Sequence, residues 1–478
     1  MEKMLVGKGT QKVFLLNNKF NQHGLIVGAT GSGKTISLKV ICEYLSSIGV
    51  PTILTDVKGD LVNITNPGSA NSKVSERIEK IGIEDFAFRG FPLTLWDVYG
   101  KQGASLRITL SQMGPVLLAR ILDLNETQEG ILNLAFRFAD QNGLLLLDLK
   151  DLKALLNYIA ENKKSLSEEF GLISSQSISA IQRKLLVLEG EGGNEFFQEP
   201  AISIEDFLKT SPSGMGQVNI INAKKLINSP KIYSIFLLWL LSELFEALPE
   251  VGNPEKPKCV FFFDEAHLLF DKAPKELLEK IRQVVKLIRS KGVGIFFITQ
   301  NPLDIDEEVL NQLGNRIVHQ LRAFSPKELE AVRKISKTFR PKEGFKVEDE
   351  ILNLKTGEAL VSFLDEDGSP RPVEKALIRP PESSFEPLSS DEIKSLLENS
   401  TYYHKYKTPI DRESAYEILK ERTILKEKTL DEKVDKHFKS SSNKKTYLEK
   451  SLDSILGSMT RTIGREIARG LLGALKRR

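Results

Sequence analysis

The chain has 478 residues, of which 41% are hydrophobic and 27% are charged, and its net charge is +3. This length predicts two or three structural units, and the composition is typical of a soluble globular protein. The two cysteines, Cys42 and Cys259, lie in apolar segments without metal-ligand spacing, which favours reduced core residues over a disulfide. Because the first residues also lack a secretory signal, we expect a cytoplasmic protein.

Near the amino end, an apolar stretch, a glycine-rich turn and a helical pattern follow one another directly. Residues 24–27 predict a buried strand, and apolar side chains at helical spacing predict a helix from Lys34 to about Ile48. The turn between them, Gly28–Thr35, matches G-x-x-x-x-G-K-[ST], the phosphate-binding loop of P-loop NTPases. In this order, backbone N–H groups and the positive end of a helix surround one phosphate group.

The loop predicts an ATP and Mg²⁺ site. We expect Lys34 to reach the β- and γ-phosphates and the Thr35 hydroxyl to hold Mg²⁺. The residues expected to bind the nucleotide are Gly28, Ala29, Thr30, Gly31, Ser32, Gly33, Lys34, Thr35 and Ile36. The alternative is a turn that only joins two core elements, and the flanking strand and helix argue against it.

The pattern becomes helical between about residues 105 and 210. Helices are expected at 116–122, after Gly114-Pro115, at 131–138, from Asp148 or Asp151 to Ile159, and at 178–188. They predict an α-helical insertion in the core. A separate apolar stretch, Ile235–Leu241, is too short to span a bilayer and predicts a buried helix.

Six near-continuous apolar runs predict strands of one parallel sheet covered on both faces, so the expected fold class is α/β. The runs are 24–28, 51–56, 217–221, 259–264, 293–299 and 316–321.

The run that begins at Cys259 ends in two adjacent carboxylates. We expect Asp264 to hold Mg²⁺ through its water shell and Glu265 to point at the water that attacks the γ-phosphate. A carboxylate that activates water suits hydrolysis better than transfer to a bound acceptor. The alternative is an acidic strand end that caps the next helix.

Two further side chains complete the predicted catalytic set. Gln300 ends the next apolar strand. In the sheet order 5-1-4-3-2, found in ATPases with this adjacent-strand glutamate, that strand lies between the phosphate-loop strand and the Asp264 strand, so Gln300 would face the γ-phosphate. Arg289, just before that strand, could neutralise charge in a neighbouring subunit's site. Their alternatives are a glutamine that bonds loop backbone and an exposed arginine at a helix end. Arg316 and Arg322 are further arginine candidates.

After the core, residues 358–364 and 371–376 flank Asp365–Ser369, which predicts a hairpin. Residues 380–384 and 439–445 are interpreted as linkers, and residues 448–475 as an amphipathic helix. Residues 439–478 hold ten Lys or Arg and three Asp or Glu, so this tail carries +7 and the other 438 residues carry −4.

Together these motifs resemble the HerA/FtsK superfamily of P-loop motor ATPases. The resemblance rests on residues 28–35, 55–61, 263–267 and 289–302. More narrowly, the chain is similar to bacterial HerA-like proteins described as helicases without an assigned process, through residues 113–128 and 463–473.

The resemblance implies a RecA-like core and a homo-hexameric ring with ATP between subunits and DNA through the pore. It also implies that Arg289 completes a neighbour's site. The chain begins 27 residues before the phosphate loop, so neither the N-terminal β-barrel of archaeal HerA nor a nuclease partner is inferred.

We expect four parts along the chain. They are a first part of the ATPase core at 1–104, the helical insertion at 105–210, the remainder of the core at 211–380, and a linker with a basic helical tail at 381–478.

Three functions stay open at this stage. The first is an ATP-driven motor on DNA, for which the acidic body is unfavourable unless a ring gathers basic residues. The second is a non-motor enzyme such as a small-molecule kinase, against which Glu265 and Gln300 argue. The third is a scaffold or switch ATPase whose basic carboxyl-terminal helix, with Arg461, Arg465 and Arg469, contacts a membrane, DNA or a protein, or simply packs on its own chain.

Overall fold

The computed structural model describes residues 2–270, 275–340 and 342–425. The chain divides into two compact units, residues 1–415 and residues 416–478. The sheet and the site belong to the first unit. Of the second, the described residues 416–425 are helical, and the linker and amphipathic helix predicted at 439–475 lie outside the described residues.

A twelve-stranded sheet organises the first unit, with the strand order β2-β1-β12-β11-β10-β3-β9-β8-β4-β7-β5-β6. The strands are β1 (Lys3–Lys8), β2 (Lys12–Leu16), β3 (Gly24–Val27), β4 (Thr52–Asp56), β5 (Leu93–Asp97), β6 (Ala104–Ser105), β7 (Val218–Asn222), β8 (Cys259–Phe263), β9 (Val293–Thr299), β10 (Asn315–Val318), β11 (Glu358–Ser362) and β12 (Glu374–Ile378).

The centre of the sheet is parallel, from β10 through β3, β9, β8, β4 and β7 to β5. All six predicted strands lie in this block, which confirms the α/β fold class, and β9 lies between β3 and β8 as the expected order requires. These strands are buried on both faces, which explains their continuous apolar runs. The pattern missed β5, whose apolar residues are interrupted by Thr94.

One side of the sheet is antiparallel. The predicted hairpin is confirmed, since β11 pairs with β12 and places Glu358 opposite Leu377. β11 also pairs with β10, and β1 joins β12 to a second, unpredicted hairpin with β2. The sheet therefore continues beyond β10 into four antiparallel strands.

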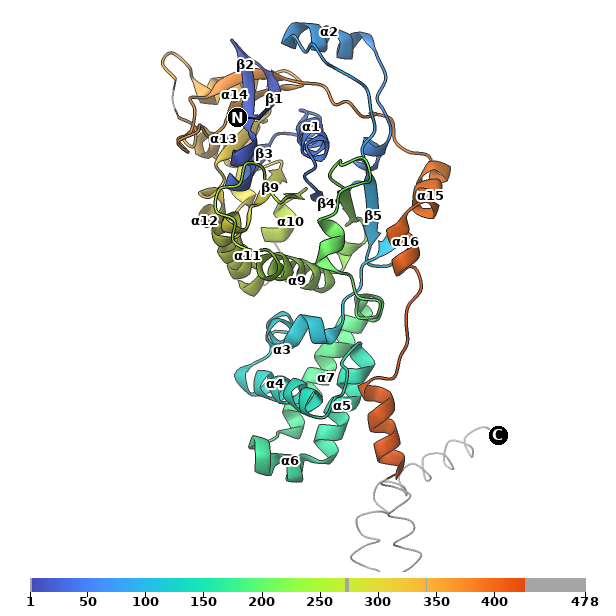
Figure 1. The fold of residues 1–478 in the computed structure, drawn as a ribbon. Helices are drawn as coiled ribbons and strands as arrows, with labels where there is room; N and C mark the ends of the chain where they lie inside the picture. Colours follow the sequence, from blue (N-terminus) through green and yellow to red (C-terminus); the bar gives the residue numbers. More distant parts are fainter. Residues whose placement is uncertain (1, 271–274, 341, 426–478) are drawn as a thin grey trace, which may run out of the picture. The chain divides into compact units, whose positions relative to one another are not determined.

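Helices cover the sheet and form the insertion (Figure 1). They are α1 (Lys34–Ser47), α2 (Ser72–Ile81), α3 (Leu110–Ile121), α4 (Glu126–Gln141), α5 (Leu149–Glu161), α6 (Lys163–Phe170), α7 (Ser175–Gly190), α8 (Gly193–Phe196), α9 (Pro230–Ala247), α10 (His267–Phe270), α11 (Lys275–Leu287), α12 (Glu307–Leu310), α13 (Pro326–Ser336), α14 (Val347–Asn353), α15 (Ser390–Glu398) and α16 (Thr401–Tyr406).

The helices predicted within residues 105–210 are present as α3, α4, α5 and α7, and α6 is an additional short helix. Asn125 and Asp148 begin α4 and α5 with reciprocal capping bonds. In α3, Gly114 has a φ of 69° and Pro115 follows it, so the helix is kinked at this point. The part boundaries at 104, 210 and 380 stay a prediction.

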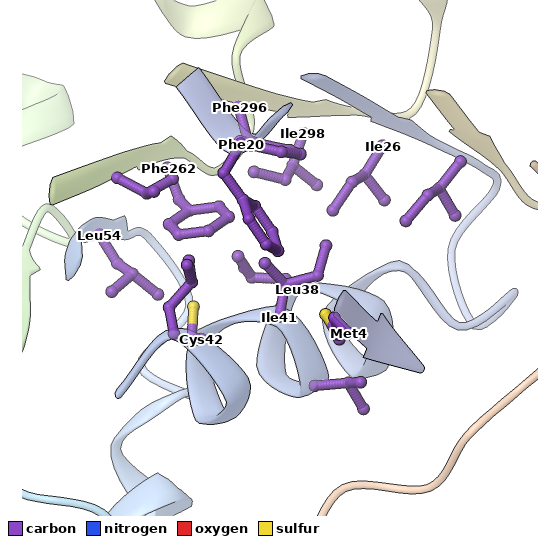
Figure 2. Packing of buried hydrophobic residues seen from close by; sticks show 14 of the residues in the cluster. Met4, Phe20, Ile26, Leu38, Ile41, Cys42, Leu54, Phe262, Phe296 and Ile298 are labelled. Carbon is purple, nitrogen blue, oxygen red and sulfur yellow. The ribbon is translucent and has the colours of Figure 1, made fainter. Parts of the chain in front are cut away.

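Helix α1 is held against the sheet by apolar packing. Figure 2 shows Leu38, Ile41 and Cys42 of α1 facing sheet residues that include Ile26 and Phe296. All five side chains are at most 1% exposed. This packing fixes the start of α1, and hence the phosphate loop, relative to the strands.

The most apolar predicted stretch lies within α9 and is buried, as expected. Among the described residues, no helix combines the length and the apolar character needed to cross a membrane.

The interpretation of residues 380–384 as a linker is wrong for its central residues. Glu382 and Ser383 are buried, and their N–H groups donate to the Glu43 carboxylate at 2.8 and 3.0 Å. The Ser383 hydroxyl donates to the same carboxylate. A buried charge on α1 therefore orders a segment whose Pro and Ser content alone suggests a loop.

Candidate active site

The phosphate loop joins β3 to α1 at the carboxyl-terminal edge of the parallel strands. The Ala29 N–H donates to the Gln320 carbonyl at 2.8 Å, and the Ser32 hydroxyl donates to the Ala29 carbonyl at 2.7 Å. Gly33 begins α1 with a φ of 121°, and a Cβ at Gly28 would lie 2.4 Å from the Ser32 Oγ. Glycine is required at both positions, by backbone conformation at one and by close approach at the other.

Lys34 lies in the first turn of α1 and is only 7% exposed. Its Nζ donates to the carbonyls of Gly28 and Ala29, at 2.5 and 3.1 Å. Burial lowers the pKa of Lys34, and the nearby Glu265 carboxylate opposes that shift. The ammonium group is thus directed into the loop and lies within the electrostatic field of the acidic residues.

His319, at the end of β10, packs beside Gly28 and Gly33 and supports the phosphate loop. Its Nδ1 is 2.9 Å from the Glu358 carbonyl and its Nε2 is 2.8 Å from the Ser37 Oγ, so we assign the proton to Nδ1. Burial lowers the pKa of His319 to about 4, and the ring is neutral near pH 7. Sequence reasoning missed this residue, and the available signal was a histidine at the end of a strand next to the loop strand.

Asp264 and Glu265 follow β8, two strands away from the phosphate loop. Burial, followed by the charge of Glu265, raises the pKa of Asp264 to about 7. A bound divalent cation would stabilise the ionised form of such a carboxylate. Glu265 has a φ of 49°, a left-handed conformation that is uncommon for a non-glycine residue and that is often found at functional sites.

Thr35 and Asp264 are the side chains that would hold Mg²⁺: both carry oxygen atoms, Thr35 lies in the first turn of α1, and the charge of Asp264 acts on Lys34 of the phosphate loop. In the described parts of the chain, no cluster of three or more His, Cys, Asp or Glu could hold a metal ion. A magnesium ion at this position therefore needs phosphate and water oxygens as its other ligands.

A chain of polar contacts links the loop to the acidic pair. The Thr30 hydroxyl donates to the Gln300 Oε1 at 3.0 Å, and the Gln300 Nε2 donates to the Glu265 carboxylate at 3.3 Å. The same carboxylate lies 2.5 Å from the Lys58 Nζ and 3.4 Å from the His267 Nδ1. Burial raises the pKa of Glu265, but the hydrogen bond and charge of Lys58 outweigh it and lower that pKa overall.

Lys58 belongs to the motif at residues 55–61, but its role could not be predicted from that motif. Asp56, the last residue of β4, accepts hydrogen bonds from the N–H groups of Lys58, Gly59 and Leu61. These bonds fold the loop after β4 so that the Lys58 side chain reaches Glu265. The signal in the sequence was an acid followed by a lysine and a glycine at the end of a strand.

Arg289 lies apart from these residues. It is exposed in a 3₁₀ helix, Ile288–Lys291, at the amino-terminal end of β9. The seven residues of β9 separate it from Gln300 by about 23 Å. The structure therefore does not bring Arg289 into the site of its own subunit.

The other two arginine candidates differ in their surroundings. Arg316 donates to the Thr338 carbonyl at 2.7 Å and is largely buried, so it is engaged within its own subunit. Arg322 is exposed beyond the end of β10.

The parallel sheet, the phosphate loop after β3 and the acidic pair after β8 define the class of P-loop ATPases with a RecA-like strand order. The family model described as "Helicase HerA-like C-terminal" matches residues 2–478. The chain therefore belongs to this HerA-like family.

The DNA double-strand break repair helicase HerA of Sulfolobus acidocaldarius is 22% identical over 382 residues, which cover 75% of this chain and 65% of the relative. The protein of the same name from Pyrococcus furiosus is 19% identical over 366 residues, covering 72% and 64%. The chain thus spans slightly less than two thirds of the length of these relatives.

Among solved structures, the plasmid coupling protein TrwB in complex with ADP and Mg²⁺ has a TM-score of 0.55 and 15% identity, covering 81% of this chain and 92% of that chain. The unbound bacterial conjugative coupling protein TrwB gives a TM-score of 0.54 at 15% identity, with 79% and 88% covered. These similarities show a shared fold, and the first was solved with a nucleotide and magnesium.

Proposed function

We propose that this chain is a motor that couples ATP hydrolysis to movement on DNA and that it works as a homo-hexameric ring. The observation that carries the proposal is the contact chain from Thr30 through Gln300 to Glu265, because it joins the phosphate loop to a carboxylate suited to activating water. Family membership and the names of the HerA relatives support DNA as the substrate.

In this proposal, the phosphates of ATP replace the carbonyls of Gly28 and Ala29 as partners of the Lys34 ammonium group. Thr35 and Asp264 would hold Mg²⁺, which would supply positive charge to the phosphate oxygens when bound. Glu265 orients the attacking water and accepts its proton. Gln300 aligns that carboxylate with the loop that holds the γ-phosphate.

Ring formation gives Arg289 a role that it cannot have in its own subunit. It is exposed at the amino-terminal end of β9, where it is available to a neighbouring subunit and would complete that subunit's ATP site. An arginine supplied in this way stabilises the charge of the transition state for phosphoryl transfer.

The test of the proposal has two parts. Phosphate release should rise when duplex or single-stranded DNA is added, and the increase should fall steeply with salt because phosphate contacts release counterions. Mass measurement with an ATP analogue and DNA should give a closed ring. A persistent monomer, or an ATPase rate that no DNA changes, would contradict the motor.

Lys34→Ala is the control for the site. It should abolish hydrolysis and weaken ATP binding, which shows that any measured turnover belongs to this loop. Labelled ATP should give inorganic phosphate as its only phosphate product, since transfer to a small-molecule acceptor would instead indicate a kinase.

A further inference from the structure

Lysine side chains gather beside the ATP site, at the same edge of the sheet. β4, β7 and β5 are neighbouring parallel strands, so the loops that follow them lie together. These loops, at residues 57–61, 223–225 and 98–103, present four exposed lysines against one exposed carboxylate, that of Asp60. The lysines are Lys58, Lys101, Lys224 and Lys225.

The three loops border a cavity of about 200 Å³, whose lining also includes the apolar side chains of Val62, Leu95, Ile220 and Ile393. Lys58 and Lys224 line it, together with the amide side chains of Gln102 and Asn222. The Asn222 Nδ2 donates to the Gln102 Oε1 at 2.9 Å, which ties the loop after β7 to the loop after β5. Ammonium and amide groups around a small cavity are the donors that bind a phosphodiester group of a nucleic acid.

The Asp56 carboxylate, which also borders this cavity, is already engaged. It accepts the three backbone N–H groups of the loop after β4. Its negative charge is therefore directed toward its own loop, and the cationic side chains dominate the outer part of the cavity.

Lys58 belongs to the cavity and to the active site at once. Its Nζ lies 2.5 Å from the Glu265 Oε1, yet its side chain is 44% exposed, whereas that of Glu265 is 6% exposed. A long lysine side chain can turn between two partners about its rotatable bonds, while the Glu265 carboxylate remains in place beside Gln300.

We propose that the cavity between the loops after β4, β5 and β7 binds a backbone phosphate of DNA, and that this phosphate draws Lys58 away from Glu265. While Lys58 is paired with Glu265, it occupies the carboxylate oxygen that would otherwise bind the attacking water. Binding of DNA frees that oxygen, so hydrolysis accelerates when the motor is on its track. The inference rests on the proposed function and adds to it the place and the residue that couple DNA to ATP.

The test compares Lys58→Met with Lys58→Arg. Lys58→Met keeps the length of the side chain but removes its charge, so the ATPase rate without DNA should rise at least about tenfold, as expected for the loss of one charged hydrogen bond. DNA should then add little further stimulation. Lys58→Arg retains a cation that can pair with either partner, so DNA should still stimulate its hydrolysis.

Lys224→Met tests the cavity separately, because Lys224 lines it and the ion pair at Glu265 involves Lys58 instead. Anisotropy of a labelled duplex of about 30 base pairs should show weaker binding and a smaller salt dependence, as expected for the loss of one phosphate contact. Lys164→Met, at an exposed lysine of α6, is the matched control and should behave as wild type. Inorganic phosphate alone should not stimulate hydrolysis.

The results separate this inference from the proposed function. A Lys58→Met protein that melts like wild type but loses ATPase activity would overturn the inference, because Lys58 would then promote hydrolysis. Wild-type stimulation in Lys58→Met, or unchanged DNA binding in Lys224→Met, would overturn it while leaving the motor intact. If DNA does not stimulate wild type, the motor and the phosphate site both fail, and a raised Lys58→Met rate would then report only the restraint on Glu265.

Discussion

The two ends of the central strands each hold a buried polar residue, and the two residues have different kinds of partner. At the carboxyl-terminal end, the Glu265 side chain bonds to the side chains of Lys58 and Gln300. At the amino-terminal end, the His23 side chain bonds to the backbone. The buried His23 is 2.7 Å from the Val285 carbonyl through its Nε2, and its Nδ1 accepts from the Ile295 N–H at 3.0 Å.

The difference shows how one sheet separates support from chemistry. Bonds between a buried side chain and the backbone fix neighbouring elements, because breaking them leaves buried donors and acceptors without partners. An ion pair with one exposed member, such as Lys58 with Glu265, can exchange partners when a ligand arrives. His23 therefore ties β9 to α11 firmly at the amino-terminal end, whereas the Lys58–Glu265 pair at the carboxyl-terminal end can change when a ligand binds.

The largest expected effect concerns Arg289, at the amino-terminal end of β9 in one subunit, and the ATP site at the carboxyl-terminal end of the strands in its neighbour. Arg289→Ala should lower ATP hydrolysis by about 10³- to 10⁵-fold while ATP binding is unchanged, if Arg289 completes a neighbour's site. Mixing it with Lys34→Ala subunits should restore part of the rate, because some interfaces then combine an intact loop with an intact arginine. Lys291→Ala, on the same 3₁₀ helix, is the control. Full activity of Arg289→Ala would show that this residue takes no part in ATP hydrolysis.

Removing the base should have the next largest effect. Glu265→Gln should lower turnover by about 10²- to 10⁴-fold, the usual contribution of a positioned base, and should leave ATP bound. Phosphate release and binding of a fluorescent ATP analogue measure the two properties separately. Turnover at the wild-type rate would remove Glu265 from the chemistry.

His23, at the amino-terminal end of the central strands, should make the stability of the fold depend on acid. Burial lowers the pKa of His23 to about 4 from 6.5, so between pH 6.5 and 4 the unfolded chain binds a proton that the folded chain does not. The free energy of unfolding should fall over this window by about 3 kcal/mol from this group. His319, whose pKa is also about 4, adds a similar loss.

Urea unfolding from about pH 7.5 to about pH 4.5 measures this dependence. His23→Asn should be less stable near neutral pH, since it cannot reproduce both bonds, but its stability should fall less as the pH drops. Asparagine tolerates the φ of 58° at this position. His404→Asn, at an exposed histidine, is the control. Parallel curves for wild type and His23→Asn would show that His23 does not cause the acid sensitivity.

The smallest expected effect concerns the link across the active site. Gln300→Ala should slow hydrolysis by about tenfold with little change in ATP binding, since one hydrogen bond to a charged group is lost. Thr30→Val removes the other end of the same link. If the two act together, the double variant should be no slower than Gln300→Ala alone, whereas multiplied defects would show that they act independently.

Much of the site could be predicted because its signals are local. Gly28, Gly33 and Lys34 stand at fixed spacing between a buried strand and a helix, and Asp264 and Glu265 directly follow an apolar strand. The position of Gln300 followed from the expected strand order, which the sheet confirms. The unpredicted strands β1, β2, β5 and β6 are short or lie near a sheet edge, where the apolar pattern is weak.

The amino-acid sequence by itself determined the α/β class, the phosphate loop and the acidic pair. Each of these depends on consecutive residues whose spacing matches a strand, a turn or a helix. Only the tertiary structure decided that Lys58 pairs with Glu265 and that His319 supports the phosphate loop. It also decided that residues 382–383 bond to Glu43 and that Arg289 lies at the amino-terminal end of β9, away from the ATP site. The partner of a polar side chain depends on which strands become neighbours, and that choice is made by packing between segments far apart in the chain.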